Sequence, residues 1–95
     1  MGKYYMLVIE ILERMSGLSE AEILGGRSEL CADYRSMLVE LLSKKYANNE
    51  VVRLTGLTRQ SVSRISSAHA DRMKSKYSMR MAMHDAATEV SALTE

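Results

Sequence analysis

The chain contains no proline, and no stretch alternates polar and apolar residues with a period of two for long enough to form a strand. Without proline nothing breaks a helix strongly from inside, so glycine must separate the elements. Along most of the sequence, apolar residues recur instead with the helical period of 3.6. These features predict an all-α protein. Its 95 residues are enough for a single domain, residues 1–95, but not for a second folded unit of typical size.

Periodicity and capping signals together predict about six helices. Ser19 followed by Glu22 forms a capping box, and Thr58 is a good N-cap for the helix after it. Asn48 or Asn49 is expected to cap the preceding short helix. The expected helices cover residues 4–15, 20–24, 29–46, 49–55, 59–75 and 78–93.

Charge is distributed unevenly along the chain, although the formal net charge is only +1. Residues 1–34 carry three basic and six acidic side chains, whereas residues 35–80 carry ten basic and three acidic ones. Residues 81–95 add three acids. The basic central block is typical of proteins that bind nucleic acid, but a solvated helical surface explains the charge equally well.

Residues 48–66, which contain NNEVVRLTGLTRQSVSRI, have the pattern of a helix-turn-helix with Gly56 in the turn. Apolar residues lie where the two helices would meet, and the outward positions of the second helix carry hydrogen-bonding side chains and no acid. In this motif the first turns of the second helix enter the major groove of DNA. The expected base-edge contacts come from Arg59, Gln60, Ser63 and Arg64, and phosphate contacts from Lys44, Lys45, Thr58 and Ser61.

With this segment placed after a long helix and a basic loop, the chain resembles the C-terminal DNA-binding domain of the bacterial replication initiator DnaA. That fold is similar to the tryptophan repressor fold. The resemblance covers about residues 4–93 and is clearest in ILGGRSELCADYRSMLVELL and LTGLTRQSVSRI. It implies that Arg27 enters the minor groove and that Arg35 contacts DNA beside it, at phosphate. An arginine on a glycine-flanked loop can reach a narrow groove, where the negative potential is strongest.

The chain departs from this family at the recognition helix. Thr58 and Arg59 replace acidic and imidazole side chains, and Glu29 stands where the family usually has a further basic residue. The sequence has no GxxxxGK[ST] phosphate loop, so the initiator's ATPase is not expected. We therefore expect the family's docking mode without its own target sequence.

Nothing in the sequence points to an enzyme, a metal or another cofactor. His69 and His84 are fifteen residues apart, and neither has a second ligand at helical metal spacing. His69 is expected on the surface of its helix or beside a phosphate. Cys31 lies on an apolar face and has no base to activate it, so we expect it to be inert.

The last helix carries an apolar stripe with alternating spacings of four and three, made of Met79, Met83, Ala86, Val90 and Leu93. Such a stripe indicates core packing or the seam of a homodimer. A site for a hydrophobic ligand, suggested by the methionines beside Tyr77, is the less favoured alternative. No window reaches the roughly 20 apolar residues that cross a membrane, and no signal peptide is recognisable. We expect a cytoplasmic location.

The expected function is sequence-selective binding of double-stranded DNA. Two alternatives stay open. One is a free-standing transcriptional regulator of a phage or mobile element, with no connection to replication. The other is a protein-interaction module in which the same helical face binds a protein partner and no DNA.

Overall fold

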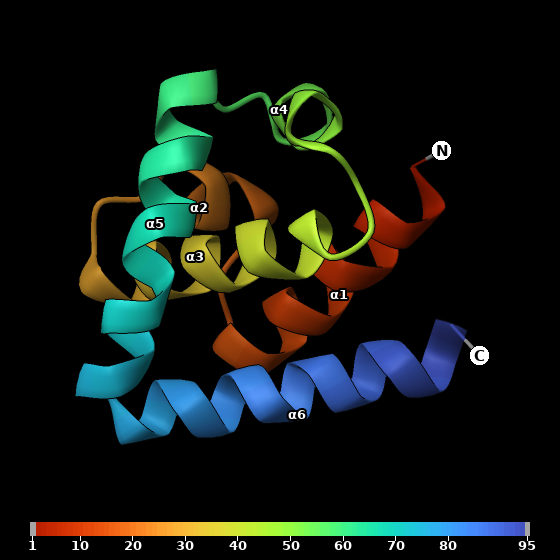
Figure 1. Ribbon diagram of the computed structural model, residues 1–95. Coiled ribbons are helices and arrows are strands. Elements are labelled where there is room, and N and C mark those ends of the chain that lie inside the picture. The colour runs from red at the N-terminus through yellow and green to blue at the C-terminus, as the bar shows by residue number, and fades with distance from the viewer. Residues whose placement is uncertain (1, 95) are drawn as a thin grey trace.

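The computed structural model describes residues 2–94 and contains six helices, as the sequence predicts, with no strand in that range. The helices are α1 (Lys3–Ser16), α2 (Glu20–Gly25), α3 (Glu29–Ser43), α4 (Asn48–Thr55), α5 (Arg59–Ser75) and α6 (Tyr77–Thr94). In Figure 1, α3 runs through the middle of the molecule, with α5 across one of its ends and α6 below it. None of these helices is long and apolar enough to cross a membrane.

The central helix α3 packs against all five other helices. Its apolar side chains are therefore among the most buried in the protein, with Met37, Leu38 and Leu42 fully inaccessible to solvent. The prediction that Cys31 faces the apolar side is confirmed, since its side chain is buried at the start of α3. Because α2, α4 and α5 all rest on α3, this helix fixes the relative positions of the loop after α2 and of the α4–α5 pair.

Local hydrogen bonds define most of the helix ends that the sequence predicts. Ser19 and Glu22 form the complete capping box, and Thr58 caps α5. The prediction of an asparagine cap for α4 is wrong, because Ala47 is the N-cap residue and Asn48 already lies in the helix. Helix α3 ends at Ser43 rather than at residue 46, because a turn in which two backbone N–H groups bond to the Leu42 carbonyl leads into α4.

The apolar stripe of α6 packs mainly into the protein's own core. Met79, Met83, Ala86 and Val90 are buried, whereas Leu93 is 60% exposed. Helix α6 contacts α1, α5 and α3, and these helices cover the stripe. Core packing is therefore confirmed for the four buried residues, which leaves them unavailable as a dimer seam in this fold.

Candidate nucleic-acid interface

The connection between α4 and α5 is fixed by backbone hydrogen bonds and by one threonine. Gly56 has a left-handed backbone (φ 75°), and its N–H donates to the Val52 carbonyl at 2.9 Å. The buried Thr55 hydroxyl donates to the Val51 carbonyl at 2.7 Å and accepts from the Leu57 N–H at 3.2 Å. These bonds satisfy groups left over at the end of α4, so the direction of α5 relative to α4 is set locally.

Helix α5 begins with a compact hydrogen-bonded cap. The Thr58 hydroxyl accepts from the Ser61 N–H at 3.0 Å and donates to the Ser61 hydroxyl at 2.9 Å. Thr58 has therefore used its only hydroxyl proton, whereas Ser61 keeps its own proton for another acceptor. Val62, one residue further on, is fully buried and anchors this end of the helix.

Three predicted base-contacting side chains form one exposed surface, which we call the α5 face: Arg59, Gln60 and Ser63. None of the three pairs through its side chain with any residue between 2 and 94. From Arg59 to Ala70 the helix contains no acid. The α5 face therefore offers uncommitted donors at the positive end of a helix dipole.

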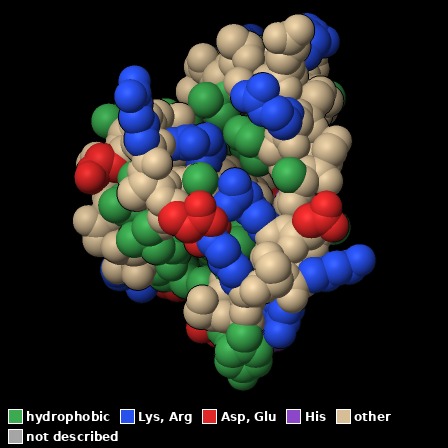
Figure 2. Space-filling model, turned by 90° about the vertical axis from the view of Figure 1, so that its left-hand side faces the viewer, with side chains coloured by type: hydrophobic (Ala, Val, Ile, Leu, Met, Phe, Trp, Pro, Cys, Tyr) green, Lys and Arg blue, Asp and Glu red, His purple; other side chains and the backbone are tan. Residues whose placement is uncertain are grey.

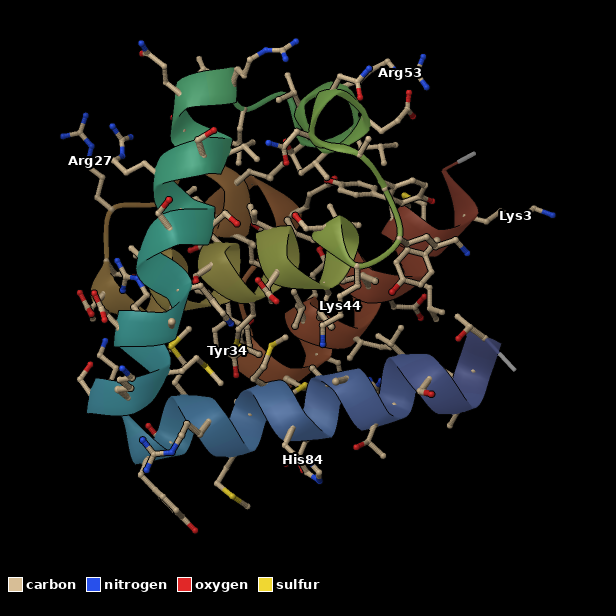
Figure 3. All side chains as sticks on the ribbon, viewed as in Figure 1. Lys3, Arg27, Tyr34, Lys44, Arg53 and His84 are labelled. Carbon is tan, nitrogen blue, oxygen red and sulfur yellow. The ribbon has the colours of Figure 1, made fainter. Side chains whose placement is uncertain are left out.

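Arg27 lies on the loop between α2 and α3. Figure 3 shows its side chain extending away from the molecule on the side of α5. It is exposed and forms no ion pair with the described part of the chain. The preceding Gly26 allows the loop to lie close to α3, because a Cβ atom there would be 2.4 Å from the Cys31 sulfur.

The Arg35 side chain is hydrogen-bonded to the beginning of the same loop and to the end of α2. Its Nε donates to the Ile23 carbonyl at 2.9 Å, and one of its terminal nitrogens donates to the Gly26 carbonyl. These acceptors lie at the C-terminal end of α2, where unpaired carbonyls attract a cation. The structure thus places the Arg35 side chain against the carbonyl that precedes Arg27 and gives it two intramolecular partners.

Arg64 lies with Arg35 and Arg72 on the walls of a cleft of about 260 Å³ between α3 and α5. It is exposed, and its nearest polar contact is a long one of 3.5 Å to the Ser61 hydroxyl. Figure 2 shows Lys and Arg side chains gathered around the middle of this side of the molecule. We call this feature the arginine cleft.

Lys44 and Lys45 are not brought together with the other predicted phosphate contacts. Figure 3 shows Lys44 at the end of α3 pointing toward α6, away from Arg27. It lines a groove that also includes Tyr4 and Thr94. The Lys45 ammonium lies 4.4 Å from the centre of the Tyr4 ring.

The prediction that His69 lies on the helix surface is wrong. The residue is only 9% exposed, and its Nδ1 lies 2.7 Å from the hydroxyl of the buried Ser36 on α3. Burial lowers the pKa of His69, which favours the neutral ring, although Glu40 partly opposes this effect. The spacing could have revealed this position, because His69 is seven residues after Val62 and so lies on the same side of the helix.

Part of the basic block is neutralised within the protein. Arg72 reaches Asp33 at 2.9 Å and Glu29 at 3.3 Å. Lys76 lies 3.0 Å from Asp33 and also contacts Glu29. The hydrogen bond from Lys76 lowers the pKa of Glu29, and the same bond raises the pKa of Lys76. Sequence analysis missed this network because its members lie about forty residues apart.

No known protein family, curated protein or solved structure matches this chain. The resemblance to DnaA therefore stays a prediction from the residues quoted above. Across residues 2–94, no cluster of three or more His, Cys, Asp or Glu side chains could hold a metal ion.

Proposed function

We propose that this protein binds double-stranded DNA sequence-selectively, with α4 and α5 acting as a helix-turn-helix. The observation that carries the proposal is the α5 face together with Arg27. Both offer exposed donors that no other described side chain occupies. In this arrangement the N-terminal end of α5 enters the major groove, and Arg27 enters the adjacent minor groove.

The chemistry of the α5 face suits recognition of bases. Arginine donates two hydrogen bonds to guanine, and glutamine both donates to adenine and accepts from it. Arg59 and Gln60 would supply these contacts, while the hydroxyl proton left on Ser61 suits a phosphate oxygen. Arg35 has a positioning role here, because it holds the loop that carries Arg27.

The bound sequence separates the biological roles that this proposal leaves open. A DnaA-like protein would use the family's docking mode in replication, without an ATPase of its own. A regulator of a phage or mobile element would bind an operator. A palindromic site with half-sites about one DNA turn apart would indicate a homodimer, and an asymmetric site would indicate a monomer.

The test is selection from a random duplex library, followed by fluorescence anisotropy on the selected duplex and a scrambled one. Measurements at about 50 and 200 mM salt report the phosphate contacts, because each neutralised phosphate steepens the salt dependence by about 0.9. We expect one enriched motif, a clear preference for it over scrambled DNA, and weaker binding to both duplexes at the higher salt.

Absence of binding even at low salt would overturn the proposal. A protein-interaction module would then become the leading function. The exposed apolar residues Leu30, Tyr77 and Met81, near the beginnings of α3 and α6, are its specific support. Salt-sensitive binding without an enriched motif would instead contradict sequence selectivity and indicate a general DNA binder.

A further inference from the structure

The arginine cleft combines charge with room for a small ligand. Arg35 comes from α3, and Arg64 and Arg72 come from α5, so the cationic side chains approach the cleft from both helices. Ala32 and Ala68 also line the cleft and are too short to fill it. Its volume of about 260 Å³ is ample for a phosphate group with bound water.

Each guanidinium keeps donors that the protein itself does not use. Arg35 employs its Nε and Nη2 on backbone carbonyls, which leaves Nη1 without an acceptor among residues 2–94. Arg72 employs only Nη1 on carboxylates. Arg64 has no contact shorter than the 3.5 Å one to Ser61. Two of the three arginines are therefore held in place before any ligand arrives, and the third is free to close on it.

The nearby carboxylates do not cancel the positive charge. Asp33 and Glu29 pair with Arg72 and Lys76, so these four side chains sum to zero. Arg35 and Arg64 remain as an excess of two positive charges. One phosphodiester carries a single negative charge, and the partly buried Arg35 attracts it more strongly than a cation in open solvent does.

We propose that the arginine cleft is a phosphate-binding site that receives a phosphate of the DNA backbone. The position follows from the proposed function, on which this inference rests. The sugar-phosphate backbone separates the major from the minor groove, so it must cross the protein between the α5 face and Arg27. The cleft lies there: Arg35 donates to the carbonyl preceding Arg27, and Arg64 follows Gln60 by about one helical turn. Arg64 thus contacts phosphate rather than a base edge.

The test compares Arg64→Gln with Arg59→Gln and with the matched control Arg14→Gln on α1. We expect Arg64→Gln to weaken binding about tenfold on both the selected and the scrambled duplex, and to flatten the salt slope by about one unit. Arg59→Gln should weaken only the selected duplex. Arg14→Gln removes the same charge from an ion pair with Glu89 and should leave both affinities unchanged.

Loss of affinity confined to the selected duplex in Arg64→Gln would overturn the proposal, because it would identify a base contact. Unchanged binding and an unchanged salt slope would overturn it too, while leaving DNA binding itself intact. The control measurement is a melting curve, in which Arg64→Gln should match the wild type because its side chain is exposed.

The phosphate in the cleft could come from the DNA backbone or from a free phosphate compound. Titration of the DNA-free protein with pyrophosphate distinguishes these two sources. We expect the amide NMR signals of Ala32 and Ala68 to shift in the wild type and not in Arg64→Gln. If the wild type shows these shifts and binds no DNA, the proposed function fails, and the cleft stands as a site for a free phosphate compound. If neither pyrophosphate nor DNA engages Arg64, the cleft proposal fails.

Discussion

The two halves of α5 use similar side chains in opposite ways. In the N-terminal half, Arg59 has no partner in the described structure, and Arg64 has only one long contact. In the C-terminal half, Arg72 is ion-paired with two carboxylates, and His69 is hydrogen-bonded to a buried serine. The side chains of the first half are available to a ligand, whereas those of the second half mainly attach the helix to α3, although Arg72 also lines the arginine cleft.

This contrast shows why counting charges along a sequence overstates a binding surface. The basic block contains ten Lys and Arg residues, but Arg72 and Lys76 meet acids that precede the block in the chain. Ion pairs between distant residues depend on how helices cross, which the count does not include. The proposed complex should therefore have a smaller footprint on DNA than the charge of the block suggests.

The largest expected effect separates the two halves directly. Arg59→Ala should reduce affinity for the selected duplex by roughly 1–3 kcal/mol and lower its preference over scrambled DNA. Lys76→Ala, just beyond the other end of α5, should leave that preference unchanged because its ammonium faces Asp33 and Glu29. Anisotropy on both duplexes measures the preference of each variant. If the two variants lost the same preference for the selected duplex, the two halves of α5 would not differ in function.

The second expected effect is on stability. The Asp33 side chain is only 13% exposed, so Asp33→Asn should lower the free energy of unfolding by about 1–2 kcal/mol, because a neutral amide replaces the charged acceptor of Arg72 and Lys76. The affinity of the folded protein for DNA should not fall. Urea denaturation tests this, with Glu89→Gln, which breaks a more exposed pair, as the control expected to change stability less. A loss of DNA affinity without a loss of stability would contradict the structural role.

The third prediction compares two glycines that have the same left-handed backbone conformation. Gly17 and Gly56 both have φ 75° and open space where a Cβ would lie, so alanine at either position should cost about 1 kcal/mol of stability. Only Gly56→Ala alters the connection that orients α5. It should therefore weaken DNA binding by the folded protein, whereas Gly17→Ala should not. Equal affinities for the two variants would show that the turn does not control the α5 face.

The smallest expected effect concerns pH. Because burial lowers the pKa of His69 in the folded state, the unfolded chain takes up this proton first as pH falls. The contribution of His69 to stability is thus complete above about pH 6.5 and declines below it, until the folded protein is protonated as well. Urea titrations between pH 7.5 and pH 5.5, with His69→Gln as reference, should show a steeper decline in the wild type. Parallel curves would contradict the assigned environment.

Most local features of this molecule were predictable, whereas the crossings between helices were not. Ser19, Gly56 and Thr58 act through bonds to residues within four positions of them, so the sequence alone indicates the ends that they cap. The Asp33–Arg72 pair requires α5 to cross α3 at a particular place, which no periodicity specifies.

The candidate site shows the same division. The sequence predicts the exposed side chains at the beginning of α5, and the structure places them together. The sequence does not predict that Arg35 and Arg64 line one cleft, or that Lys44 lies on a different side of the molecule. Helical periodicity assigns a residue to a side of its own helix, but the neighbour on that side depends on the packing of the whole chain.

Gly26 limits how this protein can vary. A side chain there would meet the Cys31 sulfur at 2.4 Å and the Glu22 carbonyl oxygen at 2.6 Å. A smaller residue at position 31 would remove only the first clash, because the second is with the backbone and no neighbouring substitution relieves it. The α5 face consists of exposed side chains, so its residues can change one at a time. Position 26, in the loop that carries Arg27, cannot change by a single substitution, so this position must remain glycine while the residues of the α5 face change.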